Sequence, residues 1–253
     1  MTYAVPLLSV MSVLLCLIPE ITSVPAWAIF LVNIPLTIRI VGMNHELFHE
    51  PPSKLGGNRL LRLNLHVYTP LTIGFDEYRE LHLRHHAYDN SDRDPDFRMI
   101  RDGKHNALWR LALAPEYWFL YCMKHGILSR DFWLLYIGRM LVLAGYVALV
   151  GVENYLLLFL LPTKLAFALS FLVFSYESHT DATGKPRSIW NLKPRLTLLN
   201  RAIYWSIGPY AYNIAYHHAT HHAYPWVSGV KLSEVRGPDF PLAHGFPERS
   251  VLF

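Results

Sequence analysis

Histidines recur at close and repeated spacings along this chain. A pentad HxxHH occurs twice and an HxxxH pair, with two histidines over the same length, precedes it. These three boxes carry His45, His49, His82, His85, His86, His218, His221 and His222. With 14 histidines in 253 residues, random placement predicts roughly 0.04 copies of such a pentad. In a helix, positions i, i+3 and i+4 share one face, so each pentad directs three imidazoles toward one point. Clustered imidazoles indicate a metal site for zinc, copper, iron or nickel.

The number of histidines indicates more than one ion. Nine candidate ligands result when His179, at the end of an apolar run, is added to the eight box histidines. A tetrahedral ion takes about four ligands, so nine suit two ions better than one. His217 also lies four residues before His221, which leaves the register of the third box open between His217 and His218.

The composition predicts a membrane protein. Hydrophobic residues make up 52% of the chain and charged residues 17%, and the mean hydropathy is +0.19. Crossing the hydrocarbon core takes about 20 mostly apolar residues. Four apolar runs approach that length, at about 3–19, 21–43, 132–150 and 155–178. We therefore expect an all-α membrane protein, a single domain over residues 1–253, with four transmembrane helices in two hairpins.

The basic residues orient these spans. Segment 39–130 carries 13 Lys and Arg and segment 185–249 carries eight, while the short turns around Glu20 and Glu153 carry none. By the positive-inside rule both termini and the central segment are cytoplasmic. A cytoplasmic helical cap, residues 44–131 and 179–253, then carries the histidine boxes. Lys164 is expected to snorkel and mark the outer start of a shorter fourth helix. No nucleic-acid partner is expected, because the basic residues flank apolar spans without forming a continuous stripe.

Polar residues near the boxes are candidates to orient the ligand histidines by hydrogen bonds to the ring nitrogen that does not bind the metal. The residues of this set are Asn44, Asp94, Asp96, Glu177, Asp181, Asn213 and His217. The spacing DxDxD, which ends at Asp96, is not a calcium loop, because Pro95 interrupts it and the required Gly and Glu are missing. Trp109, Trp118 and Tyr121 lie in an aromatic-rich stretch, which we expect to anchor at the headgroup layer.

The order of the boxes, HxxxH, HxxHH and HxxHH around paired apolar helices, resembles the membrane fatty acid desaturase superfamily of histidine-box desaturases, hydroxylases and carotenoid ketolases. The likeness runs from about residue 21 to 232. Asp94-Pro95-Asp96-Phe97 is similar to the DPD or DPE segment that often follows the second box in that superfamily. Tyr224-Pro225-Trp226 is similar to its proline-containing tail, and His179 matches the position of its extra histidine ligand.

This resemblance implies a non-haem di-iron centre that uses O2 to desaturate a long-chain fatty acyl group or similar lipid chain, with no catalytic residue beyond the metal ligands. No HPGG-like haem segment is present, so the resemblance implies a separate electron donor of ferredoxin, rubredoxin or cytochrome type. A carotenoid ketolase or hydroxylase, or an alkyl hydroxylase, stays open. Two departures bear on this: the first box reads HELFH where many ketolases have HDxxH, and the NYxEHYG-like box of alkane hydroxylases has no counterpart.

Two other classes of function compete with this interpretation. His45-Glu46-Leu47-Phe48-His49 is a literal HExxH, the zinc protease signature in which Glu46 is the general base. A protease requires Glu46 and leaves the third box without a role. A metal transporter requires ligands at the bilayer midplane, whereas these histidines are expected at the inner ends of the spans.

Overall fold

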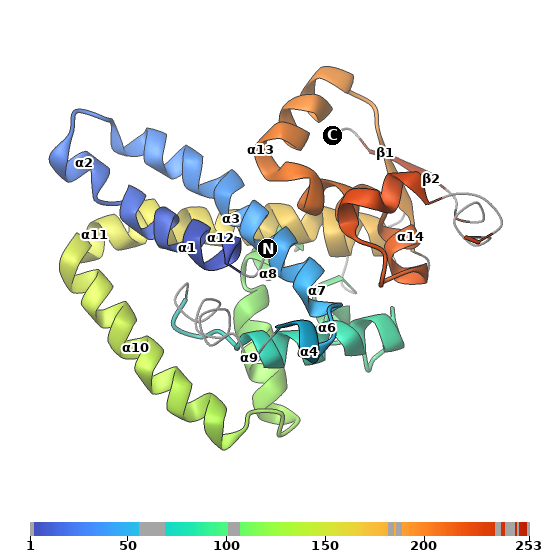
Figure 1. Cartoon of the computed structure of the whole chain (residues 1–253), viewed down its shortest axis with the longest axis horizontal. Helices are drawn as coiled ribbons and strands as arrows, with labels where there is room; N and C mark the ends of the chain where they lie inside the picture. The colour runs from blue at the N-terminus through green and yellow to red at the C-terminus, as the bar shows by residue number, and fades with distance from the viewer. Residues whose placement is uncertain are drawn as a thin grey trace.

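The chain folds into a helical bundle with one two-stranded parallel sheet (Figure 1). The computed structural model describes residues 3–55, 69–100, 107–181, 185, 189–235, 239–240, 246 and 248–251. In chain order the elements are α1 (Ala4–Leu15), α2 (Ile18–Ile21), α3 (Ala26–Phe48), α4 (Pro52–Leu55), α6 (Phe75–Tyr88), α7 (Phe97–Ile100), α8 (Ala107–Ala112), α9 (Ala114–Lys124), α10 (Arg130–Val150), α11 (Val152–Asn154), η2 (Tyr155–Leu160), α12 (Leu161–Phe171), η3 (Leu172–Glu177), β1 (Asn191–Pro194), α13 (Thr197–Tyr216), α14 (His218–Ala223), η4 (Gly229–Glu234) and β2 (Glu248–Val251).

Among the described residues, three helices are long and apolar enough to cross a membrane: α3, α10 and the continuous run Val152–Glu177. They correspond to three of the four predicted spans. The remaining span, 3–19, forms the 12-residue helix α1, which rises about 18 Å and so falls short of a hydrocarbon core of about 30 Å. It lies against α3, where the Ser12 hydroxyl donates to Asn33 Oδ1 at 2.9 Å. The count of four spans in two hairpins therefore stays a prediction.

The second predicted span is displaced along the chain. It was expected over about 21–43, whereas the candidate spanning helix α3 begins after Pro25 and continues to Phe48, so the first histidine box starts on the same helix as the candidate span. Hydropathy marks where apolar side chains end, whereas a helix ends where its backbone bonding ends. Asn44, His45 and Glu46 are polar but continue the helix, which stops just before the Pro51–Pro52 pair.

The last span avoids the predicted interruption at Pro162. The π-helical stretch η2 precedes α12, and Pro162 lies in the first turn of α12, where a missing N–H costs little. A second π-helical stretch, η3, ends just before His179. The expectation for Lys164 was wrong: its ammonium pairs with the Glu116 carboxylate of α9 from inside the helix and does not mark the helix start.

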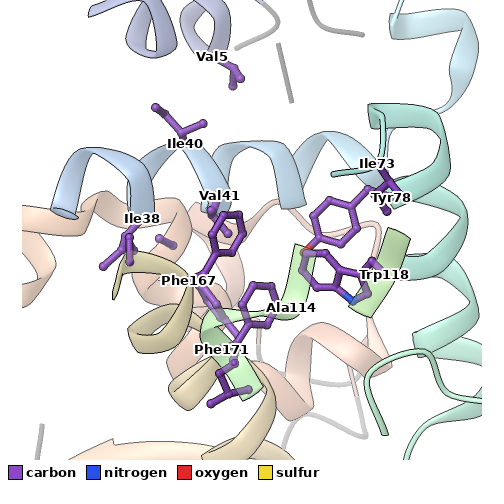
Figure 2. Close-up of a cluster of buried hydrophobic side chains, with 14 of the residues drawn as sticks. Val5, Ile38, Ile40, Val41, Ile73, Tyr78, Ala114, Trp118, Phe167 and Phe171 are labelled. Atoms are coloured by element: carbon purple, nitrogen blue, oxygen red, sulfur yellow. The ribbon is translucent and has the colours of Figure 1, made fainter. Parts of the chain in front are cut away.

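An aromatic core lies beneath the histidine helices (Figure 2). Trp118 is 2% exposed and packs on Tyr78 and Phe171, with ring centroids 4.3 and 5.0 Å away. The headgroup prediction was therefore wrong for Trp118, although Trp109 is exposed. This core joins α6, α9 and α12, and so it fixes the second histidine box relative to the last span.

The crossing of α3 and α13 depends on a glycine. A Cβ on Gly42 would lie 2.5 Å from Ala211 Cβ and 2.6 Å from Ala211 Cα. Gly42→Ala should therefore separate the two helices and lower the stability by about 1–3 kcal/mol, the usual cost of overpacking. Thermal unfolding in detergent measures this. Gly138→Ala on α10 is the matched control, because nothing lies within 4 Å of its added Cβ; an equal melting temperature in both variants would contradict the predicted close contact.

Candidate metal centre

Four separate segments bring the nine candidate histidines together. His45 and His49 come from the end of α3, the second box from α6, His179 from the residues after η3, and the third box from α14. The backbone of His217 (φ −107°, ψ 39°) ends α13 and starts α14. This break turns the third box away from the axis of α13 and toward the other histidines.

Eight of the nine histidines form two groups of four. The first quartet is His45, His49, His82 and His221, and the second quartet is His85, His179, His218 and His222. Within each quartet one ring nitrogen per residue lies within 4.8 Å of the others. Bonds of about 2.0–2.1 Å from imidazole nitrogens to one ion bring neighbouring nitrogens about 3 Å apart. The closest pairs match this: His49 and His82 Nε2 are 2.8 Å apart, and His179 and His218 Nε2 are 2.9 Å apart.

The hydrogen bonds of the second quartet fit a bound cation. His218 Nδ1–H donates to the Ile214 carbonyl at 3.2 Å, and His222 Nδ1–H donates to Asp89 Oδ2 at 3.0 Å. A neutral imidazole carries one proton, so both Nε2 atoms then present lone pairs, and these atoms are 3.0 Å apart. Two facing lone pairs repel each other, whereas a metal ion between them binds both. The donor set therefore fits a metal.

His86 lies between the two quartets. Its Nε2 is 3.1 Å from His82 Nε2 of the first quartet, and its ring stacks on His222 of the second with centroids 4.1 Å apart. Its Nδ1 is buried and, within the described part of the chain, has no hydrogen-bond partner. The position suits a fifth ligand of the first quartet.

Burial keeps most of these imidazoles neutral. It lowers the pKa of His49 to about 4 and that of His218 to about 3, so both lone pairs are available for a metal at pH 7. His85 is the exception. Burial acts to lower its pKa too, but the carboxylates of Asp94, Asp96 and Asp89 together outweigh burial and raise the pKa to about 10, with Asp94 contributing the most of the three. A carboxylate behind an imidazole makes it a more basic ligand.

Asp94 and Asp96 occupy the orienting positions expected after the second box. His85 Nδ1–H donates to Asp94 Oδ1 at 2.9 Å, which leaves Nε2 for the quartet. Asp94 also accepts the backbone N–H groups of Asn90 and Asp96. Asp96 Oδ1 in turn accepts the Trp118 indole N–H at 2.8 Å, and burial raises the pKa of Asp96 to about 6. The loop after α6 is thus fastened to both His85 and the aromatic core.

Asp89 was missed from the sequence, although it supports the second quartet. Its Oδ2 accepts from His222, and it forms a third possible metal group with His85 and Asp94. Burial raises its pKa to about 7. The sequence did contain a signal for this role: Asp89 lies three residues after His86, and residues about one helical turn apart share a face of the helix.

The other expected orienting residues differ in their contacts. Asn44 is 1% exposed and, among the described residues, neither of its amide atoms has a hydrogen-bond partner, while Asn213 is buried on α13. The Glu177 carboxylate binds Arg249, and Asp181 Oδ1 accepts the Lys185 N–H. His217 is in neither quartet; the structure thus assigns the third box to the register that begins at His218.

The sequence comparison agrees with this arrangement. A profile of the fatty acid desaturase family matches residues 22–250, nearly the whole chain and both quartets. The chain belongs to the fatty acid desaturase family. No curated protein and no solved structure matches it. Membership of the desaturase family, together with the three apolar helices, makes the chain a membrane oxidoreductase with a lipid substrate and an external electron donor.

Proposed function

We propose that this desaturase-family protein is a membrane non-haem di-iron oxygenase that uses O2 and external electrons to desaturate a long-chain fatty acyl group or a similar lipid chain. The observation that carries the proposal is the pair of adjacent imidazole quartets beside an apolar cavity, at one end of the candidate spans. When bound there, two irons would supply the activation of O2 that hydrogen removal from an unactivated C–H bond requires.

The residues of the chain have separate roles in this proposal. The nine histidines would hold the metals, with His86 between the quartets. Asp94 and Asp89 hold the protons on Nδ1 of His85 and His222, so that the opposite nitrogens face the metal side. The aromatic and aliphatic side chains around the histidines exclude water, which protects the site from side reactions.

An apolar cavity of about 170 Å³ lies beside the first quartet. It is lined by Ile38, Leu169, Ser170, Val173, Phe174, Ile203, Ile207, Ala215 and Tyr216. The Phe174 ring lies nearly parallel to His45, with centroids 6.2 Å apart. A cavity of this lining suits an alkyl chain and offers no charged group to a polar substrate. We place the reacting part of the lipid chain here.

The first half of α13 separates this cavity from the outside. Ile203 and Ile207 line the cavity, while Leu198 and Trp205 on other faces of the same half-helix are 82% and 75% exposed. Gly208, with φ 81°, ends this half, and Arg39 of α3 donates to the carbonyls of Trp205 and Ser206. Exposed apolar side chains suit contact with acyl chains, which favours entry of the substrate from the bilayer.

The distribution of basic residues supports placing the histidine end on the cytoplasmic side. A donor of ferredoxin, rubredoxin or cytochrome type would then reach the metals from the cytoplasm. Ketolation and hydroxylation, of a carotenoid or an alkyl chain, are the alternative outcomes within the superfamily, because the same ligands can support either.

The contacts of Glu46 disfavour the protease alternative. Glu46 Oε2 accepts the backbone N–H of Gly229 at 2.8 Å, so this carboxylate faces η4. A general base must reach a water on the metal. The three histidines of the third box, which a protease leaves unused, all belong to the two quartets.

The test is to measure metal content and products of the detergent-purified protein. We expect about two irons per chain and, with O2 and a reducing system, new double bonds in long-chain lipids detected by mass spectrometry. A hydroxyl or keto product would favour the alternatives within the superfamily. One zinc per chain with no oxidised lipid would overturn the proposal.

Filling the cavity should separate substrate binding from metal binding. Ile207→Trp is expected to lower product formation at least about tenfold, since the indole occupies space needed by the chain, while the iron content stays at the wild-type level. Leu198→Trp, on the exposed side of the same half-helix, is the matched control and should keep the wild-type rate. Equal rates for Ile207→Trp and the wild type would place the substrate elsewhere.

A further inference from the structure

The small sheet of β1 and β2 bonds to both segments that supply most of the second quartet. The strands are parallel, and Leu192 pairs with Arg249 in their register. One segment is the turn that carries His179, and the other is α14, which carries His218 and His222. The sheet lies outside the metal centre, so its contacts act on the ligands through the backbone.

Arg249 of β2 binds the residues on both sides of His179. Its Nη1 donates to the carbonyls of Glu177 and Thr180 at 2.9 and 2.6 Å and to Thr180 Oγ1 at 3.2 Å. Its Nη2 pairs with Glu177 Oε2 at 2.7 Å. These contacts flank His179, whose side chain is fully buried. A guanidinium presents five N–H donors in a fixed plane, so it fixes both flanking residues together.

Asn191 of β1 binds the third box in the same way. Its Nδ2 donates to Thr220 Oγ1 at 2.9 Å, and its Oδ1 accepts the Thr220 N–H at 3.1 Å. Thr220 lies between His218 and His221 on α14. The backbone N–H of Trp190, the residue just before β1, donates to the Ser178 carbonyl at 2.8 Å, so the start of β1 is also tied to the turn of His179.

The two quartets differ in their dependence on this sheet. Three members of the first quartet come from α3 and α6, whose positions are fixed by helix packing. In the second quartet, His179, His218 and His222 all lie on segments bonded to the sheet, and only His85 comes from α6. Loosening the sheet therefore separates His179 from His218 before it disturbs the first quartet.

We propose that Arg249 is a positioning residue for His179 and that the β1–β2 sheet sets metal occupancy of the second quartet separately from the first. This rests on the proposed two-metal function. The sequence separation of 70 residues between His179 and Arg249 explains why no motif reveals it.

The test is the iron content of Arg249→Ala, purified as the full chain. We expect a fall from about two irons per chain to about one, with one of the two iron environments lost from the Mössbauer spectrum of protein labelled with 57Fe. Arg249→Lys, which keeps the charge and part of the donors, should recover part of the second iron. Lys193→Ala is the matched control, because it removes an exposed ion pair with Glu248 on the same sheet and should keep both irons.

The outcomes distinguish this inference from the proposed function. Two irons in Arg249→Ala, or equal loss of both environments, overturns the positioning role and leaves the di-iron proposal intact. A wild-type protein without two irons overturns both. If Arg249→Ala does not fold, Asn191→Ala tests the other contact of the sheet; selective loss of one environment supports the inference, and retention of both overturns it.

Discussion

His218→Ala should abolish product formation, whereas His217→Ala should keep most of the wild-type rate. The two histidines are neighbours in sequence, but only His218 belongs to a quartet. His218 Nε2 lies 2.9 Å from His179 Nε2 and 3.0 Å from His222 Nε2. Removing this imidazole removes a ligand, and we expect a loss well beyond the roughly 10–100-fold cost of changing a residue behind a ligand.

Product formation and iron content are measured on both variants. His217→Ala controls for the effect of a truncated imidazole at the junction of α13 and α14. The pair also separates the two classes of enzyme, because a protease built on HELFH requires Glu46 and does not require His218. Equal rates of product formation in the two variants would contradict the assignment of the third box to the register that begins at His218.

The sequence argument for the histidine boxes rested on a spacing that coincides with the helical period. His82, His85 and His86 lie on α6 as positions i, i+3 and i+4, but the expectation that each pentad directs three imidazoles toward one point was wrong: His82 belongs to the first quartet and His85 to the second. The same periodicity could not decide between His217 and His218, since either can pair with His221. That choice depends on the backbone at His217, where α13 ends (φ −107°, ψ 39°), and hydrophobic patterning carries no information about such a break.

Helix ends and long-range contacts were beyond the sequence argument. Hydropathy located three of the apolar runs that form candidate spanning helices, but it ended the second run at residue 43, because it reports side-chain polarity and not backbone bonding. Lys164 was expected to reach water, and its pairing with Glu116 depends on how α9 packs against α12. Asp89 binds His222, and Arg249 binds the carbonyls of Glu177 and Thr180. These partners are far apart in the sequence and meet only in the folded chain, so sequence patterns did not reveal the contacts.

Asp94→Asn should have the next largest effect, because no orientation of an amide can replace this carboxylate. Asp94 Oδ1 accepts from His85 Nδ1–H at 2.9 Å and from the Asp96 N–H at 2.9 Å, while Oδ2 accepts the Asn90 N–H at 3.1 Å. Both oxygens therefore face donors. An asparagine has one acceptor and one donor end, so either orientation sets its NH2 against another N–H.

The consequence falls on His85 and through it on the second quartet. If the amide NH2 faces His85, the proton on Nδ1 is no longer held; if the amide oxygen keeps that contact, the NH2 is set against the Asn90 N–H and the loop must shift. In both cases His85 Nε2 loses its fixed direction toward the second quartet. We expect a drop of about 10–100-fold in iron affinity or rate, measured by competition with a chelator and by initial rates. Asp92→Asn is the matched control, since Asp92 is exposed in the same loop and loses the same charge. An equal drop in both variants would mean that the charge of the loop, and not its hydrogen bond to His85, supports the metal centre.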